Sequence, residues 1–429
     1  MSAHVTVIGA GFSGLVAAWA LSRKGYQVTV LERRSGPGGL IGTLDLDGFK
    51  VETAANGLLS SQLVEELFED CGVPILSTSK TARRRYLWVD GKVSRWPLGI
   101  FSTLRMLAGG LLILTAKSFR PEKHESLRSW GARAFGHRFS NRILATGVWG
   151  IFAAPAETLS ATLVTDRLYR SKDKRSSSRR GKLRGTVSAR GGMGQLISGL
   201  RSTLESRGVK FQFDVDGASA VRDVLENPAE NSSKQIVVAT SASQAAELLG
   251  AFPIFSSHVK QLKQISMLSL LNVGIHFSKP AKRQGFGTLF SQDTEVGGVD
   301  DGILGALQNS VIFSGRCSEG TSSETWILGG KEHGERLLKF SDDELLALVL
   351  EKRRKILGED EPEILNFQVT KWPAAIPHFS KNLENVQIEL GKPIGPVVLF
   401  GNYLGELGLR SILEQAEQLS LRIGNEKSV

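Results

Sequence analysis

The sequence predicts an α/β fold, and two observations lead to this prediction. Near the N-terminus, an apolar run at residues 5–8 has the length of a strand and leads directly into a glycine-rich turn at 9–14, followed by helically spaced apolar residues at 15–21. Much later, the apolar runs 235–240 and 397–400 alternate with amphipathic stretches. Such alternation is typical of a parallel sheet covered by helices, and the order of elements around residues 195–240 suggests that the chain returns there to the N-terminal domain.

The glycine-rich turn has the spacing Gly-x-Gly-x-x-Gly, which is found at dinucleotide sites. Gly9 permits the tight turn, Gly11 lets the backbone approach a pyrophosphate, and Gly14 lets the helix pack against the strand. The N-terminus of the helix that follows offers unpaired N–H groups to the phosphates, and Phe12 and Ser13 of the turn are candidate contacts. The turn therefore predicts a Rossmann-like domain that binds a dinucleotide, with a chance glycine-rich turn as the alternative.

The next predicted strand ends at Glu32, whose carboxylate can accept hydrogen bonds from a ribose. Arg33 is followed by a second glycine-rich turn that contains Gly38 and Gly39. This extension resembles the flavoprotein fingerprint of the amine-oxidase superfamily, and the resemblance favours FAD over NAD. Leu40 stands where that fingerprint usually has a basic residue. An ordinary surface turn is the alternative for this second turn taken by itself.

The composition indicates a soluble globular protein, with 41% hydrophobic and 22% charged residues in a chain of 429. Cys71 and Cys317 are the two cysteines, and they lie far apart without a Cys-x-x-Cys motif. We therefore expect neither a disulfide framework nor a metal site. The first expected core strand begins at residue 5, which leaves no room for a signal peptide, so we expect synthesis in the cytoplasm.

The net charge of +10 is concentrated in residues 170–184, which are rich in Arg, Lys and Ser and contain Asp173 as their one acid. A segment of this kind without apolar periodicity predicts a flexible, solvated connector. Attraction to an anionic membrane surface is the alternative. We do not expect nucleic-acid binding, because no recognition motif accompanies the charge.

Apolar residues are most concentrated at 98–116, but Arg105 interrupts the segment. The uncharged part that follows is shorter than the ~20 apolar residues that a spanning helix needs. Two interpretations remain open. The segment forms a buried helix, or it forms a helix that lies in the membrane interface while Arg105 and Lys117 reach the polar side.

Several short motifs occur in a fixed order after the two glycine-rich turns. They lie at residues 82–97, 150–154 with 159–160, 285–290, 303–305 with 310–313, 325–330 and 371–377. Each motif is short, but in this order they resemble the oxygen-dependent protoporphyrinogen oxidase family across essentially the whole chain. The chain departs from the family pattern at Leu40, Ala154 and Glu406. The sequence is therefore identified as a divergent member.

The resemblance implies a Rossmann-like FAD-binding domain, an interleaved, mostly β (α+β) substrate domain, and a helical region that contacts the membrane. The FAD-binding domain would comprise 1–76, 187–250 and 385–429; the substrate domain a strand at 77–84 and residues 251–384; the helical region 85–162; and the basic connector 163–186. Because the apolar segment falls inside the helical region, the resemblance favours membrane contact for it.

The resemblance also implies how a porphyrinogen is held, as a large apolar macrocycle with propionate carboxylates. Arg85 is the candidate that pairs with a propionate, because a guanidinium binds a carboxylate through two hydrogen bonds. Arg83 and Arg84 compete for this role. The apolar residues implied at the substrate are Phe286, Leu289 and Leu304, for which ordinary packing in a β core is the alternative.

For FAD the resemblance implies contacts along the whole chain. Beyond Glu32, Arg33 and the two glycine-rich turns, the implied residues are Asn56, Gly57, Val215, Trp372, Gly401, Asn402, Leu407, Gly408 and Leu409. The backbone N–H groups at the start of the last predicted helix could stabilise negative charge on a reduced flavin. We expect no catalytic side chain and no metal, because the flavin itself accepts the hydride.

The implied reaction is the FAD-dependent oxidation of protoporphyrinogen IX to protoporphyrin IX by dioxygen, which forms hydrogen peroxide, in haem biosynthesis. Alternatives are coproporphyrinogen III oxidation, or amine oxidation or desaturation on the same scaffold. A flavin-binding scaffold protein with weak or no turnover is the alternative from another class. The expected location is the cytoplasm, peripherally on the inner face of the cell membrane. We also consider that the protein forms a homodimer.

Overall fold

The computed structural model describes residues 3–89, 91–96, 109–110, 117–169, 181–227, 234–291, 301–358, 362–391 and 395–425. Most of the apolar segment 98–116 and most of the basic segment 170–184 lie outside these residues. Within the described part of the chain, no helix has both the length and the apolar character needed to cross a membrane.

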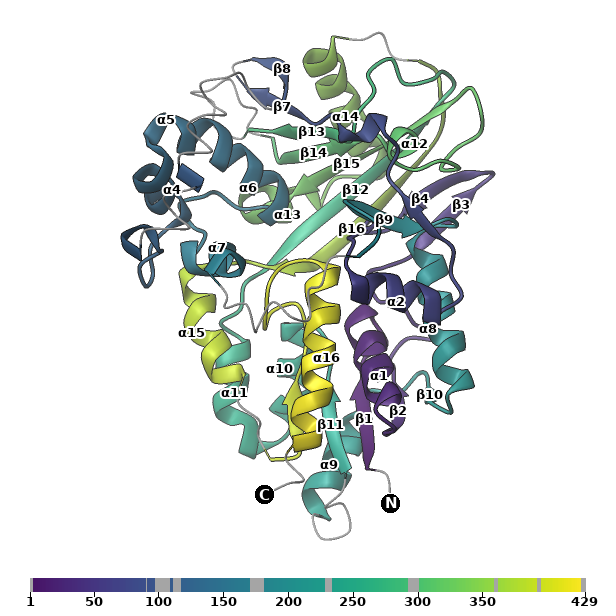
Figure 1. The fold of residues 1–429 in the computed structure, drawn as a ribbon, viewed down its shortest axis with the longest axis vertical. Helices are drawn as coiled ribbons and strands as arrows, with labels where there is room; N and C mark the ends of the chain where they lie inside the picture. Colours follow the sequence, from purple (N-terminus) through teal and green to yellow (C-terminus); the bar gives the residue numbers. More distant parts are fainter. Residues whose placement is uncertain are drawn as a thin grey trace.

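A five-stranded parallel sheet forms the lower part of the molecule in Figure 1. In spatial order its strands are β10 (Lys210–Gln212), β2 (Gln27–Leu31), β1 (His4–Ile8), β11 (Lys234–Val238) and β17 (Val397–Leu399). The N-terminal strand β1 is central because it pairs with both β2 and β11, and strands from later in the chain extend the sheet. The predicted α/β fold is confirmed.

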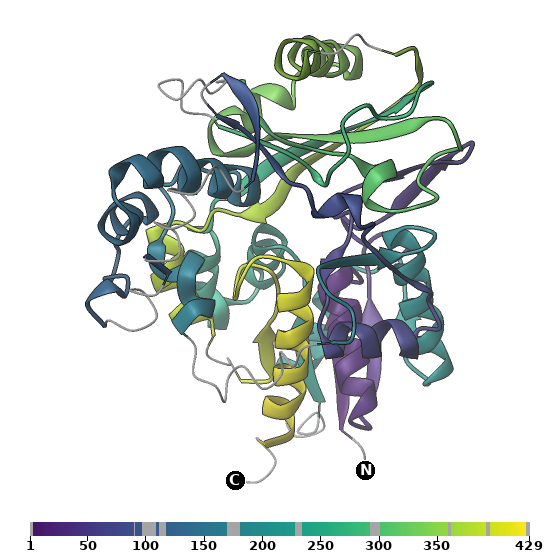
Figure 2. The same ribbon diagram turned by 45° about the horizontal axis from the view of Figure 1, so that its top comes forward.

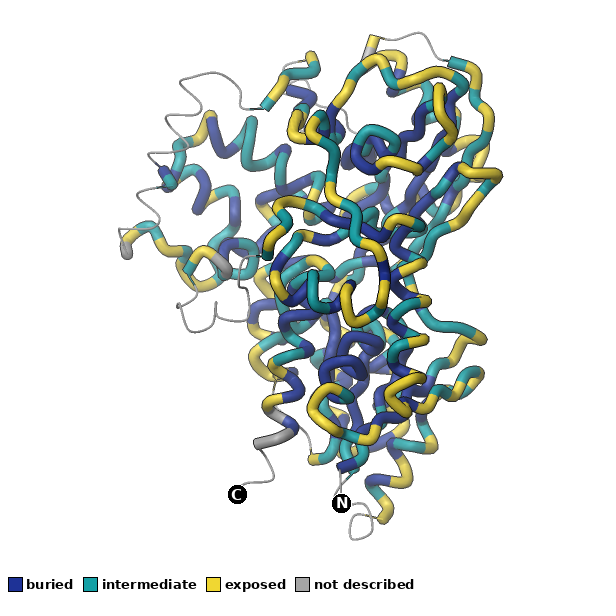
Figure 3. Tube along the Cα trace, turned by 45° about the vertical axis from the view of Figure 1, so that its right-hand side comes forward, coloured by how far each residue is buried: buried dark blue, intermediate teal, exposed yellow. Residues whose placement is uncertain are grey.

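Helices cover both faces of this sheet, since its strands are apolar on both sides. The helices that share an apolar cluster with Val5 and Val7 are α1 (Phe12–Arg23), α2 (Gln62–Asp70), α8 (Met193–Ser206) and α16 (Leu409–Asn425). The cluster that contains Ile8 includes residues of α9 (Ala218–Glu226), α10 (Ala242–Gly250), α11 (Ser256–Leu262) and α15 (Lys381–Leu390), and it extends to helices of the group described below. The 3-10 helix Pro253–Phe255 lies between α10 and α11. Figure 3 shows the buried residues running through the middle of these layers.

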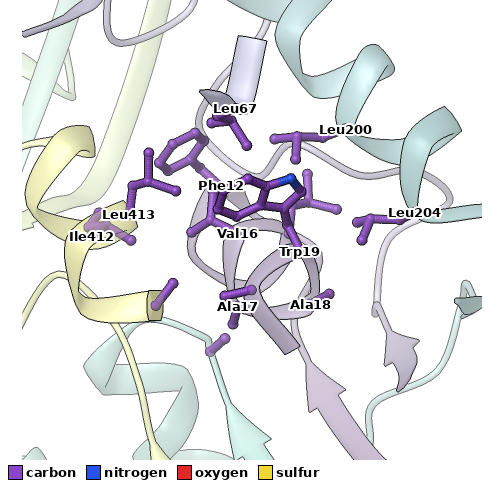
Figure 4. Close-up of a cluster of buried hydrophobic side chains, with 14 of the residues drawn as sticks. Phe12, Val16, Ala17, Ala18, Trp19, Leu67, Leu200, Leu204, Ile412 and Leu413 are labelled. Atoms are coloured by element: carbon purple, nitrogen blue, oxygen red, sulfur yellow. The ribbon is translucent and has the colours of Figure 1, made fainter. Parts of the chain in front are cut away.

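Helix α1 is buried from Phe12 to Leu21, apart from Ser13. Figure 4 shows its side chains between α8 and α16. Because β1 and β17 are parallel and each is followed by its helix, α1 and α16 both begin at the carboxyl end of the sheet. This is the edge at which parallel α/β sheets bind ligands.

A seven-stranded sheet forms the upper part of the molecule (Figures 1 and 2). Its strands in spatial order are β16 (Ile364–Pro377), β12 (Met267–Phe277), β15 (Ser322–Gly329), β14 (Ile303–Leu307), β13 (Gly287–Phe290), β7 (Tyr86–Val89) and β8 (Lys92–Arg95). Helix α12 (Asn309–Ile312) lies between β14 and β15, and α13 (Gly330–Leu337) and α14 (Asp342–Leu357) follow β15. Apolar residues of α14 pack on the outer face of this sheet, in one cluster with Val273 and Trp326.

Two small sheets join the larger parts. They are β3 (Thr43–Leu46) with β4 (Phe49–Glu52), and β5 (Leu58–Leu59) with β9 (Thr186–Ala189) and β6 (Ile75–Ser77). The strand expected at 77–84 is wrong. Residues Thr81–Arg83 form a 3-10 helix, and the strand that enters the seven-stranded sheet is β7, because the apolar residues Leu87 and Trp88 supply its buried pattern.

A group of helices lies beside the seven-stranded sheet in Figure 2. It contains the 3-10 helix Lys117–Phe119, α4 (Leu127–Phe135), α5 (His137–Phe139), the π-helix Ser140–Leu144, α6 (Ala145–Phe152) and α7 (Ala161–Tyr169). Helix α6 contacts β13 and β14. At the other expected boundary, residue 384 falls inside α15, whose helix continues across it.

Candidate functional site

The turn after β1 is closed by two glycines that leave no room for a side chain. Gly9 has a φ of +104°, and a Cβ on it would lie 3.0 Å from the carbonyl oxygen of Ala239. A Cβ on Gly14 would lie 1.8 Å from the carbonyl oxygen of Gly9. At Gly11, by contrast, the nearest atom to an added Cβ would be the Cα of Gly39 at 3.8 Å. A Cβ on Gly11, at the uncapped start of α1, would therefore make only an ordinary van der Waals contact with the protein.

Both oxygens of the Glu32 carboxylate are held by backbone N–H groups. Oε2 accepts from Ala10 at 2.7 Å and Oε1 accepts from Arg34 at 2.8 Å. The carbonyl oxygen of Glu32 also accepts from the N–H of Val215 at 3.0 Å. Each carboxylate oxygen keeps acceptor capacity for a ribose hydroxyl. Glu32, Val215 and the first glycine turn thus lie together.

The second glycine-rich turn lies directly against the first. The N–H of Gly38 donates to the carbonyl oxygen of Ala10 at 2.8 Å. Gly38 and Gly39 have φ of +121° and +64°, and a Cβ on Gly39 would lie 3.0 Å from the Cα of Gly11. The two turns therefore form one cradle, and their close approach requires glycine at positions 38 and 39.

Three residues of the implied FAD set have other surroundings in the structure. The side chain of Phe12 is 4% exposed and packs in the core around α1, so only its backbone is left to contact a ligand at the turn. Arg33 is exposed and pairs with Glu247 at 3.8 Å on the surface. Leu40 is half-buried, and its carbonyl oxygen accepts from the hydroxyl of Thr53 at 2.7 Å.

The backbone after β4 is held by side chains of the seven-stranded sheet. Trp372 donates through Nε1 to the carbonyl oxygen of Thr53 at 2.7 Å, and Asn272 donates through Nδ2 to the same oxygen at 3.1 Å. This turn leads to Asn56, which is partly exposed, and to Gly57, where a Cβ would lie 2.4 Å from the carbonyl oxygen of Val187. Trp372 is therefore placed against a segment that runs beside the glycine cradle.

One face of the seven-stranded sheet points toward this turn and remains partly exposed. Directly paired residues share a face, and the pairs Leu270 with Trp372, Gly305 with Ile327, and Gly305 with Leu289 define that inner face. The partly exposed apolar residues on it are Leu270, Leu289, Leu307, Ile327 and Trp372. An apolar floor of this kind suits a large, flat, apolar ligand.

Helix α6 approaches the same face very closely. A Cβ on Gly150 would lie 2.5 Å from the Cδ2 atom of Leu289 and 3.1 Å from the carbonyl oxygen of Leu304. Leu289 thus lies on the floor under α6. Leu304 is 1% exposed and packs with the apolar core, so core packing accounts for its side chain.

Arg85 and Phe286 are neighbours at the edge of the floor. The guanidinium carbon of Arg85 lies 4.6 Å from the centroid of the Phe286 ring, a cation–π contact. The N–H of Phe286 donates to the carbonyl oxygen of Arg84 at 2.7 Å, which fixes the two segments to each other. Phe286 and Leu307 of the floor both pack against the small buried cluster of Ala82, Ile312 and Phe313. Arg85 is exposed and makes no ion pair with the described residues.

The C-terminal segment closes the site from the other side. Asn402 donates through Nδ2 to the carbonyl oxygen of Ala375 on β16 at 3.5 Å, and Gly401 is buried next to it. Gly408 has a φ of +115° with nothing near an added Cβ. Leu407 and Leu409 are partly buried at the start of α16. The N-terminus of α16 is therefore placed between the glycine cradle on α1 and the sheet floor.

Sequence reasoning missed a buried charged pair beneath the turn. Glu52 and Arg316 approach to 3.3 Å, and both side chains are 2% exposed. Burial raises the pKa of Glu52, although Arg316 and hydrogen bonds from Thr43 and Met193 act in the opposite direction. Nothing in the local sequence distinguishes these two residues from surface charges, because their partners lie far away in the chain.

The cradle has the chemical groups that FAD binding needs. It has a glycine at each point of close approach, an uncapped helix start and a fixed carboxylate, which are the groups that bind a pyrophosphate and a ribose. Two helix N-termini, of α1 and α16, lie at the same edge. The residues present therefore fit a dinucleotide cofactor that extends toward the sheet floor, which is the arrangement of a flavoprotein.

Comparisons with known proteins agree with this class. The family model described as flavin containing amine oxidoreductase matches residues 12–408, so the chain belongs to that family, and its cofactor is FAD. The chain is 25% identical to a chloroplastic protoporphyrinogen oxidase of Oryza sativa subsp. japonica, with 99% of this chain and 89% of that protein covered. It is 21% identical to a coproporphyrinogen III oxidase of Bacillus subtilis (strain 168), with 96% of each covered.

Solved structures share the fold over nearly the whole chain. A putative protoporphyrinogen oxidase from Exiguobacterium sp. 255-15 has a TM-score of 0.74 at 16% identity, with 99% of both chains covered. Cyclohexylamine oxidase from Brevibacterium oxydans IH-35A has a TM-score of 0.69 at 16% identity, with both chains covered completely. The low identities fit the predicted divergent member of the porphyrinogen oxidase group.

Proposed function

We propose that this flavin-dependent oxidoreductase oxidises protoporphyrinogen IX to protoporphyrin IX, with dioxygen as the acceptor. The observation that carries the proposal is the Arg85 guanidinium stacked on Phe286 at the edge of an apolar floor. This arrangement offers one cation beside an apolar surface, which matches a macrocycle whose only charges are its propionates. The relatives named as porphyrinogen oxidases support the same substrate class.

Bound FAD supplies a two-electron acceptor, and three rounds remove six hydrogens from the porphyrinogen while three dioxygen molecules become hydrogen peroxide. The chain's own residues bind and orient the substrate. The floor residues Leu270, Leu289 and Ile327 exclude water from the macrocycle, and Arg85 fixes its rotation through a propionate. The first-turn N–H groups of α16 favour negative charge at the adjacent end of the site.

Coproporphyrinogen III is the second candidate, and one observation favours it. Arg83 and Arg84 precede Arg85, are exposed, and form no ion pair with the described residues. Coproporphyrinogen carries four propionates and protoporphyrinogen carries two, so additional cations at the edge of the floor suit the substrate with more carboxylates.

The deciding experiment uses the purified holoprotein with a visible flavin band. Porphyrin fluorescence, oxygen consumption and peroxide are followed with protoporphyrinogen IX, coproporphyrinogen III and a primary amine in parallel. Porphyrin formation with one peroxide per two electrons supports the proposal, and the ratio of kcat/KM values chooses between the two porphyrinogens. A protein that binds flavin without oxidising any of the three is a scaffold, and amine oxidation alone would overturn the proposal.

We further propose a cytoplasmic location with peripheral contact to an anionic membrane through the helical region. Its support is the exposure of Ile151 and Leu168, at 56% and 42%, on α6 and α7. Sedimentation with anionic and with neutral vesicles tests the contact, and binding to neither would contradict it. We also propose a homodimer, and light scattering tests it by measuring the mass of the protein in solution.

A further inference from the structure

The pair Glu52 and Arg316 joins two parts of the molecule that are built from distant segments. Glu52 ends β4 beside the glycine cradle, whereas Arg316 lies in the connection between α12 and β15 of the seven-stranded sheet. Their side chains meet at 3.3 Å, and the backbone around them is also joined, since the N–H of Lys50 donates to the carbonyl oxygen of Arg316 at 2.9 Å. The contact therefore spans the junction between the cofactor and substrate parts.

Glu52 also holds the start of α8. The N–H of Met193 donates to Oε1 and Oε2 of Glu52 at 3.0 and 3.1 Å, and the hydroxyl of Thr43 donates to Oε2 at 2.6 Å. The N-cap residue of α8 is Gly192, with a φ of +99° and no side chain to cap the helix. A Cβ on Gly192 would lie 2.2 Å from the Thr43 hydroxyl oxygen. The distant Glu52 carboxylate thus accepts the N–H of the first helical residue, Met193. The hydroxyl oxygen of Thr43 accepts the N–H of Gly194 at 2.8 Å, which a capping side chain usually binds.

Stability alone does not explain a pair buried in this way. Removing two charges from water is energetically costly, so a buried pair often adds little net stability compared with apolar residues. Burial lowers the pKa of Arg316, which reflects the same cost. Arg316 donates through Nη2 to Ser188 at 2.8 Å, while its Nη1 has no hydrogen-bond partner in the described residues. The guanidinium is therefore held in place at an energetic cost.

Thr53, the residue after Glu52, connects the Glu52–Arg316 pair to the candidate site. The carbonyl oxygen of Thr53 is bound by Trp372 and Asn272, and the side chain of Thr53 is bound to the carbonyl of Leu40 in the second glycine turn. The backbone at 52–53 is therefore fixed to the sheet floor on one side and to the cradle on the other. A shift of Glu52 would move the floor relative to the cradle.

We propose that Arg316 is a positioning residue which, through Glu52, sets the distance between the substrate floor and the FAD cradle. The inference rests on the proposed function, because it assigns the pair to the alignment of substrate with cofactor. Hydride transfer is sensitive to such alignment, and a misplacement of about 1 Å can cost about 100-fold in rate. The loss of the pair should then lower kcat more than it raises KM.

The chain contains a matched control pair. Arg353 and Glu324 approach to 3.1 Å with side chains 4% and 5% exposed. This second pair lies with Phe277 and Trp326 on the outer face of the seven-stranded sheet, away from the turn at residue 53. Both pairs are buried Arg–Glu contacts, but only the first reaches across to the cradle. A purely structural role predicts that both behave alike.

The test compares Arg316→Met and Glu52→Gln with Arg353→Met, each as the FAD-bound protein. We expect Arg316→Met to lower kcat by about 10-fold to 100-fold, with KM changed less, and to alter the visible circular dichroism of the bound flavin. Arg353→Met should lower the unfolding temperature but leave the flavin dichroism and the kcat of the folded fraction unchanged. Arg316→Lys, which keeps the charge, should recover part of kcat.

Two results would overturn the inference. One is that Arg316→Met and Arg353→Met change flavin dichroism and kcat equally, and the other is that Arg316→Met lowers only the unfolding temperature. If Arg316→Met does not fold, Glu52→Gln decides, since its amide can keep the hydrogen bond from Met193. The dichroism does not depend on porphyrinogen turnover, so a wild-type protein without oxidase activity would contradict the proposed function and still leave the positioning role testable.

Discussion

The indole of Trp372 donates through Nε1 to the carbonyl oxygen of Thr53 at 2.7 Å, although the two residues lie far apart in the sequence. Trp372 belongs to the sheet floor and Thr53 to the segment beside the glycine cradle. This hydrogen bond therefore connects the surface proposed for the substrate to the site of FAD.

We expect Trp372→Phe to keep the ring but lose this hydrogen bond, with a destabilisation of about 1 kcal/mol and a changed visible spectrum of the bound flavin. Trp130→Phe is the control, because Trp130 donates through its own Nε1 to the carbonyl oxygen of Phe119 at 2.9 Å in the helical region. The control should lose similar stability without a spectral change. Denaturant unfolding and absorption spectra measure both, and equal spectra for the two variants would contradict the assignment.

Alanine substitutions at Gly11 and Gly14 should distinguish an effect on FAD binding from an effect on folding. In Gly14→Ala the new Cβ would lie 1.8 Å from the carbonyl oxygen of Gly9, so we expect a loss of both stability and FAD. In Gly11→Ala the nearest atom would be 3.8 Å away, so the apoprotein should keep its unfolding temperature while FAD affinity falls at least about 10-fold. Fluorescence titration with FAD and thermal unfolding of the apoproteins are the measurements. Wild-type FAD affinity in Gly11→Ala would contradict the site.

Arg85→Ala should raise KM for the porphyrinogen by about 10-fold or more, because a charge-assisted hydrogen bond to a carboxylate contributes about 1.5–3 kcal/mol. Arg83→Ala is the control, since Arg83 is equally exposed but has no stacking contact with Phe286. Its KM should change less than about threefold for protoporphyrinogen. Steady-state kinetics measure both KM values. A larger rise in KM for Arg83→Ala than for Arg85→Ala would assign the propionate to Arg83.

His378 should make the folded state sensitive to mild acid. Burial, followed by the positive charge of Lys331, lowers the pKa of His378 from 6.5 to about 4. Between these two pH values His378 binds a proton in the unfolded chain but not in the folded chain. The contribution of His378 to the free energy of unfolding is therefore complete above pH 6.5 and is lost as the pH falls toward 4.

Urea unfolding across this pH range should therefore show a steeper loss for the wild type than for His378→Gln. The amide of the variant can still reach the hydroxyl of Thr158, which lies 3.0 Å from Nε2 in the wild type. The same slope in both proteins would show that another group is responsible for the pH dependence.

The local order of strands, turns and helices could be predicted where one segment carries its own pattern. The apolar runs predicted at 5–8, 235–240 and 397–400 correspond to β1, β11 and β17, and the last predicted helix corresponds to α16. The strand expected at 77–84 failed because a short segment of mixed character has no periodicity strong enough to locate it.

The sequence alone determined the glycine cradle, its acid Glu32 and the parallel sheet around them. The first glycine turn rests on contacts within a few residues, such as that of Gly14 with Gly9, so the local spacing already contains its physical constraint. Glu32 and the sheet follow from the alternating pattern of strands and helices. The second glycine-rich turn, with Gly38 and Gly39, added the expectation of a flavoprotein, which the family match confirmed.

The tertiary structure alone decided which side chains meet across the junction. Arg85 stacks on Phe286, Trp372 binds Thr53, and Arg316 pairs with Glu52, although long stretches of chain separate the two partners of each pair. The burial of a charge and its pairing depend on which distant strands the sheet brings together, and no periodicity in either segment contains that information. The cradle follows from local sequence, whereas its alignment with the substrate floor follows from the fold.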